Sequence, residues 1–252
     1  VGMDVQQIMG MVNSAEFGKE YADLNWTGSF EQYLGMVLER PEIARSSFQR
    51  VYDMIISYGS DNYVEYKKQI THWNFFDDPI DNGTDAVFGL DISLMKLVNF
   101  LKSAALGYGT EKRVLLLHGP VGSAKSTIAR LLKKGLEHYS KTEEGKLYTF
   151  SWVDPDGKVP EILGNRRELP CPMHGEPLKL VPLQARERLL GELNRGAPQG
   201  DSGEGYKIRI DGDLCPSCRF VQREFMKVYN GDWEKVIKHI RVHRLILSEK
   251  DR

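Results

Sequence analysis

The sequence predicts an α/β fold in which helices flank a parallel sheet, and three observations lead to this prediction. A wholly apolar run at 114–117 leads into a glycine-rich loop and an amphipathic helix, as where a phosphate-binding loop follows a buried strand. Helical periodicity within residues 1–85 predicts a helical N-terminal segment before the sheet domain of residues 86–252. Residues 165–222, rich in proline, glycine and charge, predict an insertion within that domain.

The composition is that of an ordinary globular protein, with 252 residues, 41% hydrophobic and 27% charged. The formal net charge of −1 gives no polycationic surface overall, so nucleic acid is not an expected partner. No apolar run approaches the ~18 residues of a membrane span, and no signal peptide is visible, so we expect a cytoplasmic protein without a membrane partner. The start at Val1 and the charged end LSEKDR suggest a fragment of a longer chain.

Two helices are expected in the N-terminal segment. Apolar residues recur at helical spacing through 30–38, and Ser29 before them is a suitable N-cap. The same spacing returns through 47–57, and Gly59 is placed to end that helix. The turn-forming run DDPIDNGTD at 77–85 marks the expected end of the segment.

Helices and strands alternate after this boundary, as an α/β domain requires. The run VLLL at 114–117 has no polar residue, which is typical of a strand buried on both faces of a parallel sheet. Apolar periodicity predicts helices at 90–106, 126–139 and 220–240 and further strands at 147–153 and 242–247.

The loop after the apolar run fits the P-loop motif G-x-x-x-x-G-K-[ST] except at one position, which predicts a P-loop NTPase. Backbone N–H groups of such a loop surround the phosphates, and the following helix directs its positive end at them. Lys125 is expected to reach the β- and γ-phosphates of ATP as the catalytic cation, and Ser126 to ligate Mg²⁺. The predicted nucleotide-contacting residues are Gly119, Pro120, Val121, Gly122, Ser123, Ala124, Lys125, Ser126 and Thr127.

The exception is Ala124, which stands where the motif has a glycine before the lysine. We expect alanine to be tolerated there if the residue already has helical dihedrals, because Gly122 supplies the backbone freedom of the turn. The substitution is therefore interpreted as an adjustment of the site and not as its loss.

A P-loop enzyme also needs an acidic residue after an apolar strand, to hold Mg²⁺ and polarise water. Asp154, Asp211 and Glu249 each follow a candidate strand, but none closes an apolar run with paired acids. A solvated strand end is the simpler interpretation of each, and catalysis is expected to depend on residues beyond Arg252.

All three cysteines fall in two closely spaced pairs, Cys171-Pro-Met-His174 and Cys215-Pro-Ser-Cys218. Two intervening residues let both side chains of a pair reach one metal, and three thiolates with one imidazole form a closed tetrahedral Zn²⁺ site. We therefore expect a structural Zn²⁺ bound by Cys171, His174, Cys215 and Cys218 that holds the ends of the insertion. The alternatives are three free cysteines with His174 on a surface turn, or a knuckle that contacts nucleic acid or protein.

Several segments in order resemble one family. AVFGLDISLMKLVNFLKSAALG and LLLHGPVGSAKST are similar to the N-terminal AAA-type ATPase domain of the PrkA family, the bacterial serine protein kinases. The upstream FEQYLGMVLERPEIARSSFQRVYDMI and the terminal VHRLILSEKDR extend the resemblance over most of the chain from Trp26 onward. The cysteine pairs resemble those of one branch of that family.

The resemblance implies an AAA+ fold that binds ATP with Mg²⁺, and a C-terminal kinase-like region in the whole protein. By motif placement, Val87, Phe88 and Gly89 would line the adenine pocket. The Walker B strand, sensor and arginine-finger residues of the family would lie past Arg252, so that the AAA domain is incomplete here. A protein substrate and a homo-oligomer are the further partners it implies.

Three functions remain open at this point. The resemblance favours an ATP-binding domain of a serine protein kinase that transfers the γ-phosphoryl group. The chain has no H-R-D, D-F-G or β3-lysine motif of protein kinases, so an AAA+ ATPase motor with a remodelling or protease-like role fits these residues equally well. The third is a nucleotide-gated binding module with a zinc knuckle.

Overall fold

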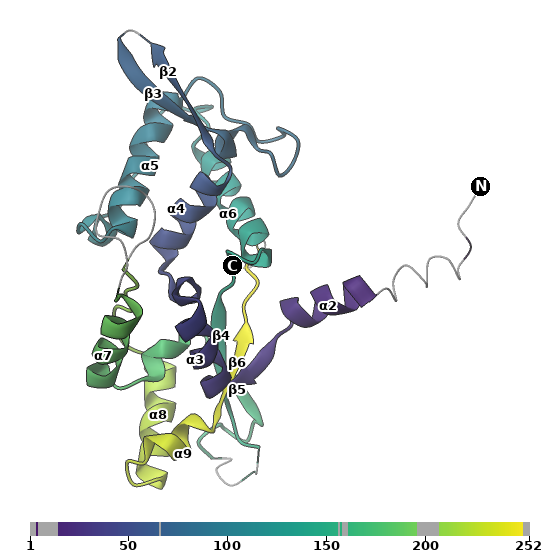
Figure 1. The fold of residues 1–252 in the computed structure, drawn as a ribbon, viewed down its shortest axis with the longest axis vertical. Coiled ribbons are helices and arrows are strands. Elements are labelled where there is room, and N and C mark those ends of the chain that lie inside the picture. The colour runs from purple at the N-terminus through teal and green to yellow at the C-terminus, as the bar shows by residue number, and fades with distance from the viewer. Residues whose placement is uncertain are drawn as a thin grey trace. The chain divides into compact units, whose positions relative to one another are not determined.

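The computed structural model in Figure 1 describes residue 4 and residues 15–65, 67–155, 157, 161–195 and 207–248. The chain divides into two compact units. The first unit comprises Val1–Met36, Leu147–Leu180 and Gly212–Ile246, and the second comprises Val37–Lys146, Val181–Asp211 and Leu247–Arg252. No helix within the described ranges is long and apolar enough to span a bilayer.

The first unit is built on a four-stranded sheet (Figure 1) whose neighbours are all antiparallel. Its order is β1 (Thr27–Ser29), β6 (Ile240–Arg244), β4 (Tyr148–Val153) and β5 (Glu168–Pro170). β4 lies between two strands and is buried along its whole length, which agrees with the strand predicted at 147–153. The polar side chain of Thr149 is tolerated there because its hydroxyl donates to the Gly175 carbonyl at 3.2 Å.

Helices of the first unit pack an aromatic core against β4. The Trp152 ring stacks on Phe225 at 5.5 Å, and Phe225 stacks on the buried His239 at 4.5 Å. Offset stacking of this kind adds to the apolar burial that fixes a helix to a strand. The helical elements assigned to this unit are α2 (Ala15–Leu24), most of α3 (Phe30–Glu39), η4 (Pro177–Leu180), α8 (Pro216–Val228) and α9 (Trp233–Ile237).

The start of α3 confirms the predicted cap at Ser29. The Gln32 N–H donates to Ser29 Oγ at 3.2 Å, and the Ser29 N–H donates to Gln32 Oε1 at 2.8 Å. This reciprocal pair satisfies two N–H groups that a helix start otherwise leaves open. The predicted helix at 220–240 is correct only in part, because Asn230 and Gly231, with φ of 52° and 84°, separate α8 from α9.

The second unit is mainly helical. Its elements are η1 (Pro41–Ala44), α4 (Ser47–Ser57), the hairpin β2 (Ser60–Glu65) and β3 (Lys68–Trp73), η2 (Asn74–Asp77), α5 (Asp91–Ala105), η3 (Thr110–Lys112), α6 (Lys125–Lys141) and α7 (Leu183–Leu193). The helices predicted at 47–57, 90–106 and 126–139 correspond to α4, α5 and α6. Gly59, with φ of 79°, follows α4 as predicted.

The core of the second unit joins residues on both sides of position 85. Phe75 and Phe76 of η2 are completely buried, and they share one apolar cluster with side chains of α4, α5 and α6. The compact units thus divide the chain differently from the boundary that the turn-rich run at 77–85 predicts, because Phe76 before the run and Val87 after it pack in one core.

The strand predicted at 114–117 is wrong for the structure as described. These residues form no strand, and Val114 and Leu116 are 93% and 80% exposed. A strand requires hydrogen-bonded neighbours, and the described strands pair only as β1-β6-β4-β5 and β2-β3, all antiparallel. The predicted parallel sheet is therefore not among the described residues, although the chain still combines helices and sheet.

Candidate functional site

No side chain caps the start of the helix that follows the predicted phosphate loop. α6 begins at Lys125, and its N-cap residue, Ala124, has no side chain able to accept from the first N–H groups. A helix leaves its first N–H donors unpaired inside the helix, and the aligned peptide dipoles make that end positive. Ser126, in the first turn, is exposed, so its hydroxyl is accessible to a ligand of that helix end. This end of α6 thus has the chemistry of an anion site.

Lys125 folds back over the loop. Its Nζ donates to the carbonyl oxygen of Pro120 at 2.5 Å and to Ser123 Oγ at 2.8 Å. Ser123 Oγ itself donates to the same Pro120 carbonyl at 2.8 Å. Both acceptors of the ammonium are neutral, whereas a phosphate oxygen carries negative charge and adds Coulomb attraction to the hydrogen bond. A phosphate oxygen is therefore a better acceptor for this lysine than either present partner.

Two glycines shape the loop. A Cβ on Gly119 would lie 2.7 Å from Ser123 Oγ, so any other residue would displace the side chain that holds the turn. Gly122 has φ of 82°, a conformation that residues with a Cβ rarely adopt. Val121, between them, is fully exposed, and Thr127 is half-buried one residue past Ser126. The motif therefore forms a turn at the start of a helix, as its sequence predicts.

Ala124 differs from the expectation. Its φ of 54° and ψ of 11° are left-handed, so the condition under which alanine was expected to be tolerated is not met. The chain must reverse between the turn and the helix, and the Ala124 carbonyl must at the same time accept from the Ile128 N–H at 2.8 Å. A left-handed L-residue costs about 1–2 kcal/mol, which explains why the motif has glycine at this position.

The segment expected to line the adenine pocket is anchored to the core that also contains α6. Val87 is 3% exposed, its N–H donates to the Phe76 carbonyl at 2.9 Å, and its side chain joins the cluster that includes Ile128. Phe88 next to it is 81% exposed, and Gly89 has φ of 69°. An exposed ring is suited to stacking on a base. The assignment of Val87–Gly89 to the adenine pocket stays a prediction.

An ion-pair cluster missed by the sequence analysis fixes the loop before Val87 to α6. Lys134 Nζ lies 2.8 Å from Asp78 Oδ2 and 3.3 Å from Asp85 Oδ2, and Arg130 pairs with Asp85. Asp78 is completely buried, which would raise the pKa of its carboxyl group, but the hydrogen bond from Lys134 and those from backbone N–H groups lower it overall. The acidic run at 77–85 was the only signal for this cluster in the sequence.

The candidate Mg²⁺-binding acids have different surroundings. Asp154 is buried in the first unit, where its N–H donates to the Arg167 carbonyl at 3.1 Å, whereas the phosphate loop belongs to the second unit. Asp211 is exposed, and Glu249 lies outside the described residues. No described residue is thus assigned the role of the missing acid.

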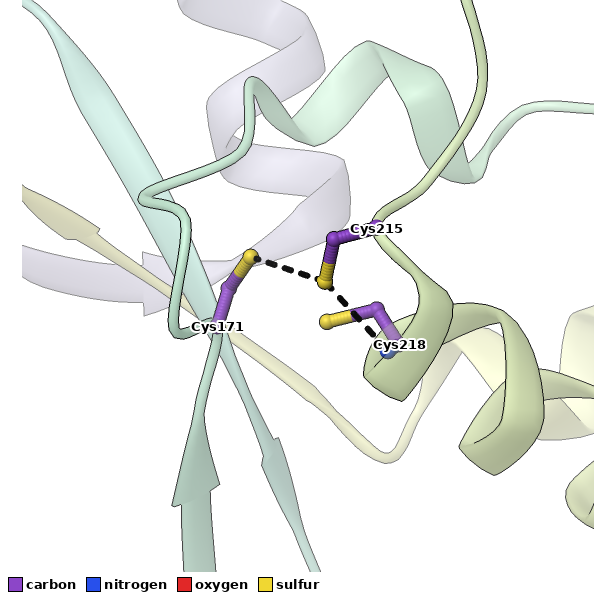
Figure 2. Close-up of side chains that lie close together, drawn as sticks. All are labelled: Cys171, Cys215 and Cys218. Carbon is purple, nitrogen blue, oxygen red and sulfur yellow. Dashed lines mark hydrogen bonds between the residues drawn. The ribbon is translucent and has the colours of Figure 1, made fainter.

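The three cysteines come together in the first unit (Figure 2). Cys171 follows β5, while Cys215 and Cys218 lie at the start of α8. The Sγ atoms of Cys171 and Cys215 are 4.0 Å apart, and all three sulfur atoms lie within 4.8 Å of one another. Within the described ranges, no histidine nitrogen or carboxylate oxygen belongs to this group, so His174 is not brought to the sulfur atoms as the spacing predicted.

The cysteine sulfur atoms form hydrogen bonds with one another and with backbone N–H groups. A hydrogen bond from Cys218 lowers the pKa of Cys171, while the same interaction and burial raise the pKa of Cys218. The Gly175 N–H donates to Cys171 Sγ at 3.2 Å, and the Cys218 N–H donates to Cys215 Sγ at 3.5 Å. The cluster therefore favours a thiolate at Cys171.

Comparisons with known proteins agree with the resemblance noted in the sequence. The chain is 32% identical over 239 residues to a Bacillus subtilis (strain 168) protein named "ATP-dependent protease PrkA", covering 94% of this chain and 30% of that protein. It is 35% identical over 92 residues to an "Uncharacterized protein in gldA 5'region" of Geobacillus stearothermophilus, covering 36% of this chain and 84% of that protein.

The chain thus spans less than a third of the length of the first of these relatives. No solved structure matches the chain. The family profile described as the PrkA AAA domain matches residues 28–252, which is most of the chain. On this match, the chain belongs to the PrkA AAA domain family.

Proposed function

We propose that this chain binds Mg-ATP through residues 119–127 and is the nucleotide-binding part of a larger PrkA-type protein. The observation that carries the proposal is the Lys125 ammonium, which is hydrogen-bonded to the loop that precedes the uncapped start of α6. Cation, turn and helix end together offer donors on several sides of one anion. An AAA domain supports ATP-dependent activity in general.

Each polar group of the loop has a distinct role in this proposal. Lys125 exchanges its two neutral acceptors for oxygens of the β- and γ-phosphates, and the first N–H groups of α6 donate to the same phosphates. Ser126, exposed in the first turn, presents its hydroxyl to Mg²⁺, a hard cation that prefers oxygen ligands. Phe88 covers the base by stacking.

ATP hydrolysis coupled to a protease-like or remodelling step is the favoured use of the bound nucleotide. The Bacillus subtilis relative carries the name ATP-dependent protease, and this chain has no protein-kinase catalytic motif. In-line attack by water on the γ-phosphate then needs an acid supplied from outside the described residues. Transfer to a protein serine, which the family resemblance suggests, is the second candidate, and nucleotide-gated binding without turnover is the third.

The binding proposal is tested with Lys125→Ala and the control Lys133→Ala, which removes an exposed lysine of the same helix. A hydrogen bond to a charged group contributes about 1.5–3 kcal/mol, so Lys125→Ala should weaken Mg-ATP binding by about 10- to 150-fold, measured by calorimetry. Lys133→Ala should bind like the parent. An unchanged affinity in Lys125→Ala would remove the loop from the site.

The variant Ser126→Ala tests the binding of Mg²⁺ separately from the binding of the phosphates. Loss of the hydroxyl should remove most of the affinity that Mg²⁺ adds, while binding of ATP in the presence of a chelator stays as in the parent. Equal sensitivity to Mg²⁺ in the two proteins would show that Ser126 is not the ligand.

The fate of the γ-phosphate is measured on the full-length protein with γ-labelled ATP. Release of phosphate without an acceptor protein supports the ATPase, and label on a serine side chain supports the kinase. Binding of ATP with neither outcome supports the nucleotide-gated module. Lys125→Ala in the full-length protein should greatly reduce hydrolysis or transfer at sub-saturating ATP, because both reactions require the bound triphosphate.

A further inference from the structure

The spacing of the three cysteine sulfur atoms matches a metal site. A Zn–S bond of about 2.3 Å places the sulfur atoms of a tetrahedral site about 3.8 Å apart. The Sγ atoms of Cys171 and Cys215 are 4.0 Å apart, and the third sulfur lies within 4.8 Å of both. A disulfide needs about 2.05 Å between its sulfur atoms, so no pair in the cluster is oxidised in this arrangement.

The backbone around the cluster is arranged to support negative sulfur. The Gly175 N–H donates to Cys171 Sγ and the Cys218 N–H to Cys215 Sγ, at 3.2 and 3.5 Å. A Cβ on residue 175 would lie 3.2 Å from Cys171 Sγ, so the glycine permits this close approach. Cys215 is the N-cap of α8, whose positive end also favours thiolates.

A buried donor without an acceptor points at the same cluster. Trp152 is completely buried on β4, and its Nε1 has no hydrogen-bond partner among the described residues. A lone buried N–H costs free energy, so native structures rarely keep one without reason. This N–H interacts with the Cys218 side chain, so it lies beside the sulfur cluster. A thiolate at Cys218 would give this N–H the acceptor that it lacks.

We propose that Cys171, Cys215 and Cys218 bind one Zn²⁺ through three thiolates, and that His174 is not a ligand. His174 follows Cys171 in a tight turn, closed by its N–H to the Cys171 carbonyl at 3.1 Å, yet its ring is exposed and outside the sulfur group. No histidine nitrogen or carboxylate oxygen of the described residues joins the group, so a solvent molecule would complete the coordination. Thiolates without carboxylates favour Zn²⁺ over hard cations such as Mg²⁺.

This metal would link two distant parts of the chain. Cys171 and Cys218 are each 2% exposed, and Cys171 lies 44 residues before Cys215. The metal therefore joins the end of β5 to the start of α8, across a stretch of chain that includes α7. The unfolded chain does not hold these three sulfur atoms together, so the free energy of zinc binding stabilises the folded first unit.

The test is the zinc content of protein purified without oxygen and after growth with added zinc. We expect one zinc per chain in the parent and in His174→Ala, and none in Cys171→Ser, Cys215→Ser or Cys218→Ser. Zinc-free parent protein would overturn the proposal. So would retention of zinc in all three serine variants, or loss of zinc in His174→Ala.

A second measurement keeps the proposal testable if a serine variant does not fold. Co²⁺ is exchanged for zinc in the folded parent protein, and thiolate-to-cobalt charge-transfer absorption reports the sulfur ligands. Three thiolates predict the intensity of a three-sulfur site, and the same spectrum is expected for His174→Ala. A cobalt spectrum without sulfur charge transfer would contradict the assignment. So would a difference between the spectra of His174→Ala and the parent that shows the loss of one ligand.

Discussion

Replacing Ala124 by glycine should stabilise this protein, which is unusual for a substitution next to a helix. Ala124 has φ of 54° and ψ of 11°, and a left-handed L-residue costs about 1–2 kcal/mol. Glycine removes that cost but loses about 0.5–1 kcal/mol more backbone entropy on folding than alanine. The difference predicts a gain of about 0.5–1 kcal/mol for Ala124→Gly. The substitution also restores the glycine of the P-loop motif.

The matched control is Ala129→Gly, an exposed position inside the same helix, where the same chemical change should destabilise by about 1 kcal/mol. Urea unfolding followed by circular dichroism measures both variants against the parent, and a thermal scan should show Ala124→Gly melting about 1–4 °C higher. A loss of stability in Ala124→Gly equal to that of Ala129→Gly would mean that residue 124 is right-handed, and the reasoning would fail.

Two further predictions concern ion pairs of the second unit. Lys134→Met leaves the buried Asp78 carboxylate without its ammonium partner, and it should lower the free energy of unfolding in urea by about 3–5 kcal/mol. The control Lys133→Met changes an exposed position and should stay within about 0.5 kcal/mol of the parent. Similar losses of stability in both variants would refute the role of the Lys134–Asp78 pair. His72 bonds to Asp77 at 2.9 Å and to Asp91 at 2.8 Å, and these bonds raise its pKa despite partial burial. Its contribution to stability should therefore be complete below about pH 6.5 and be lost as pH rises through the raised pKa, so unfolding of His72→Gln should lack this pH dependence.

Local pattern was enough for most of the helices and for the turn that precedes α6. The spacing of apolar residues located α4, α5 and α6, and Ser29 and Gly59 were recognised because caps depend on one or two neighbouring residues. The hairpin of β2 and β3 was missed, because its strands are exposed along most of their length and carry a weak apolar signal. Rules that depend on neighbouring residues therefore located these helices and caps, and they missed a hairpin whose strands have little apolar pattern.

Long-range pairing could not be predicted in this way. The antiparallel neighbours of β4 are β5 and β6, and β6 lies almost a hundred residues later in the chain. The apolar run at 114–117 suggested a strand because composition measures a preference for burial, but a strand exists only where a partner supplies hydrogen bonds. Likewise, nothing in the sequence around Lys134 identifies Asp78 as its partner.

The sequence by itself determined the P-loop motif, the family resemblance and the residue types able to bind a metal, since these depend on spacing within a few residues. Tertiary structure decided the left-handed conformation of Ala124, the placement of Lys125 on neutral acceptors and the exclusion of His174 from the sulfur group. The physical reason is that the spacing of residues along the sequence limits which side chains are able to reach one point. Backbone direction and packing with distant segments decide which of them do so.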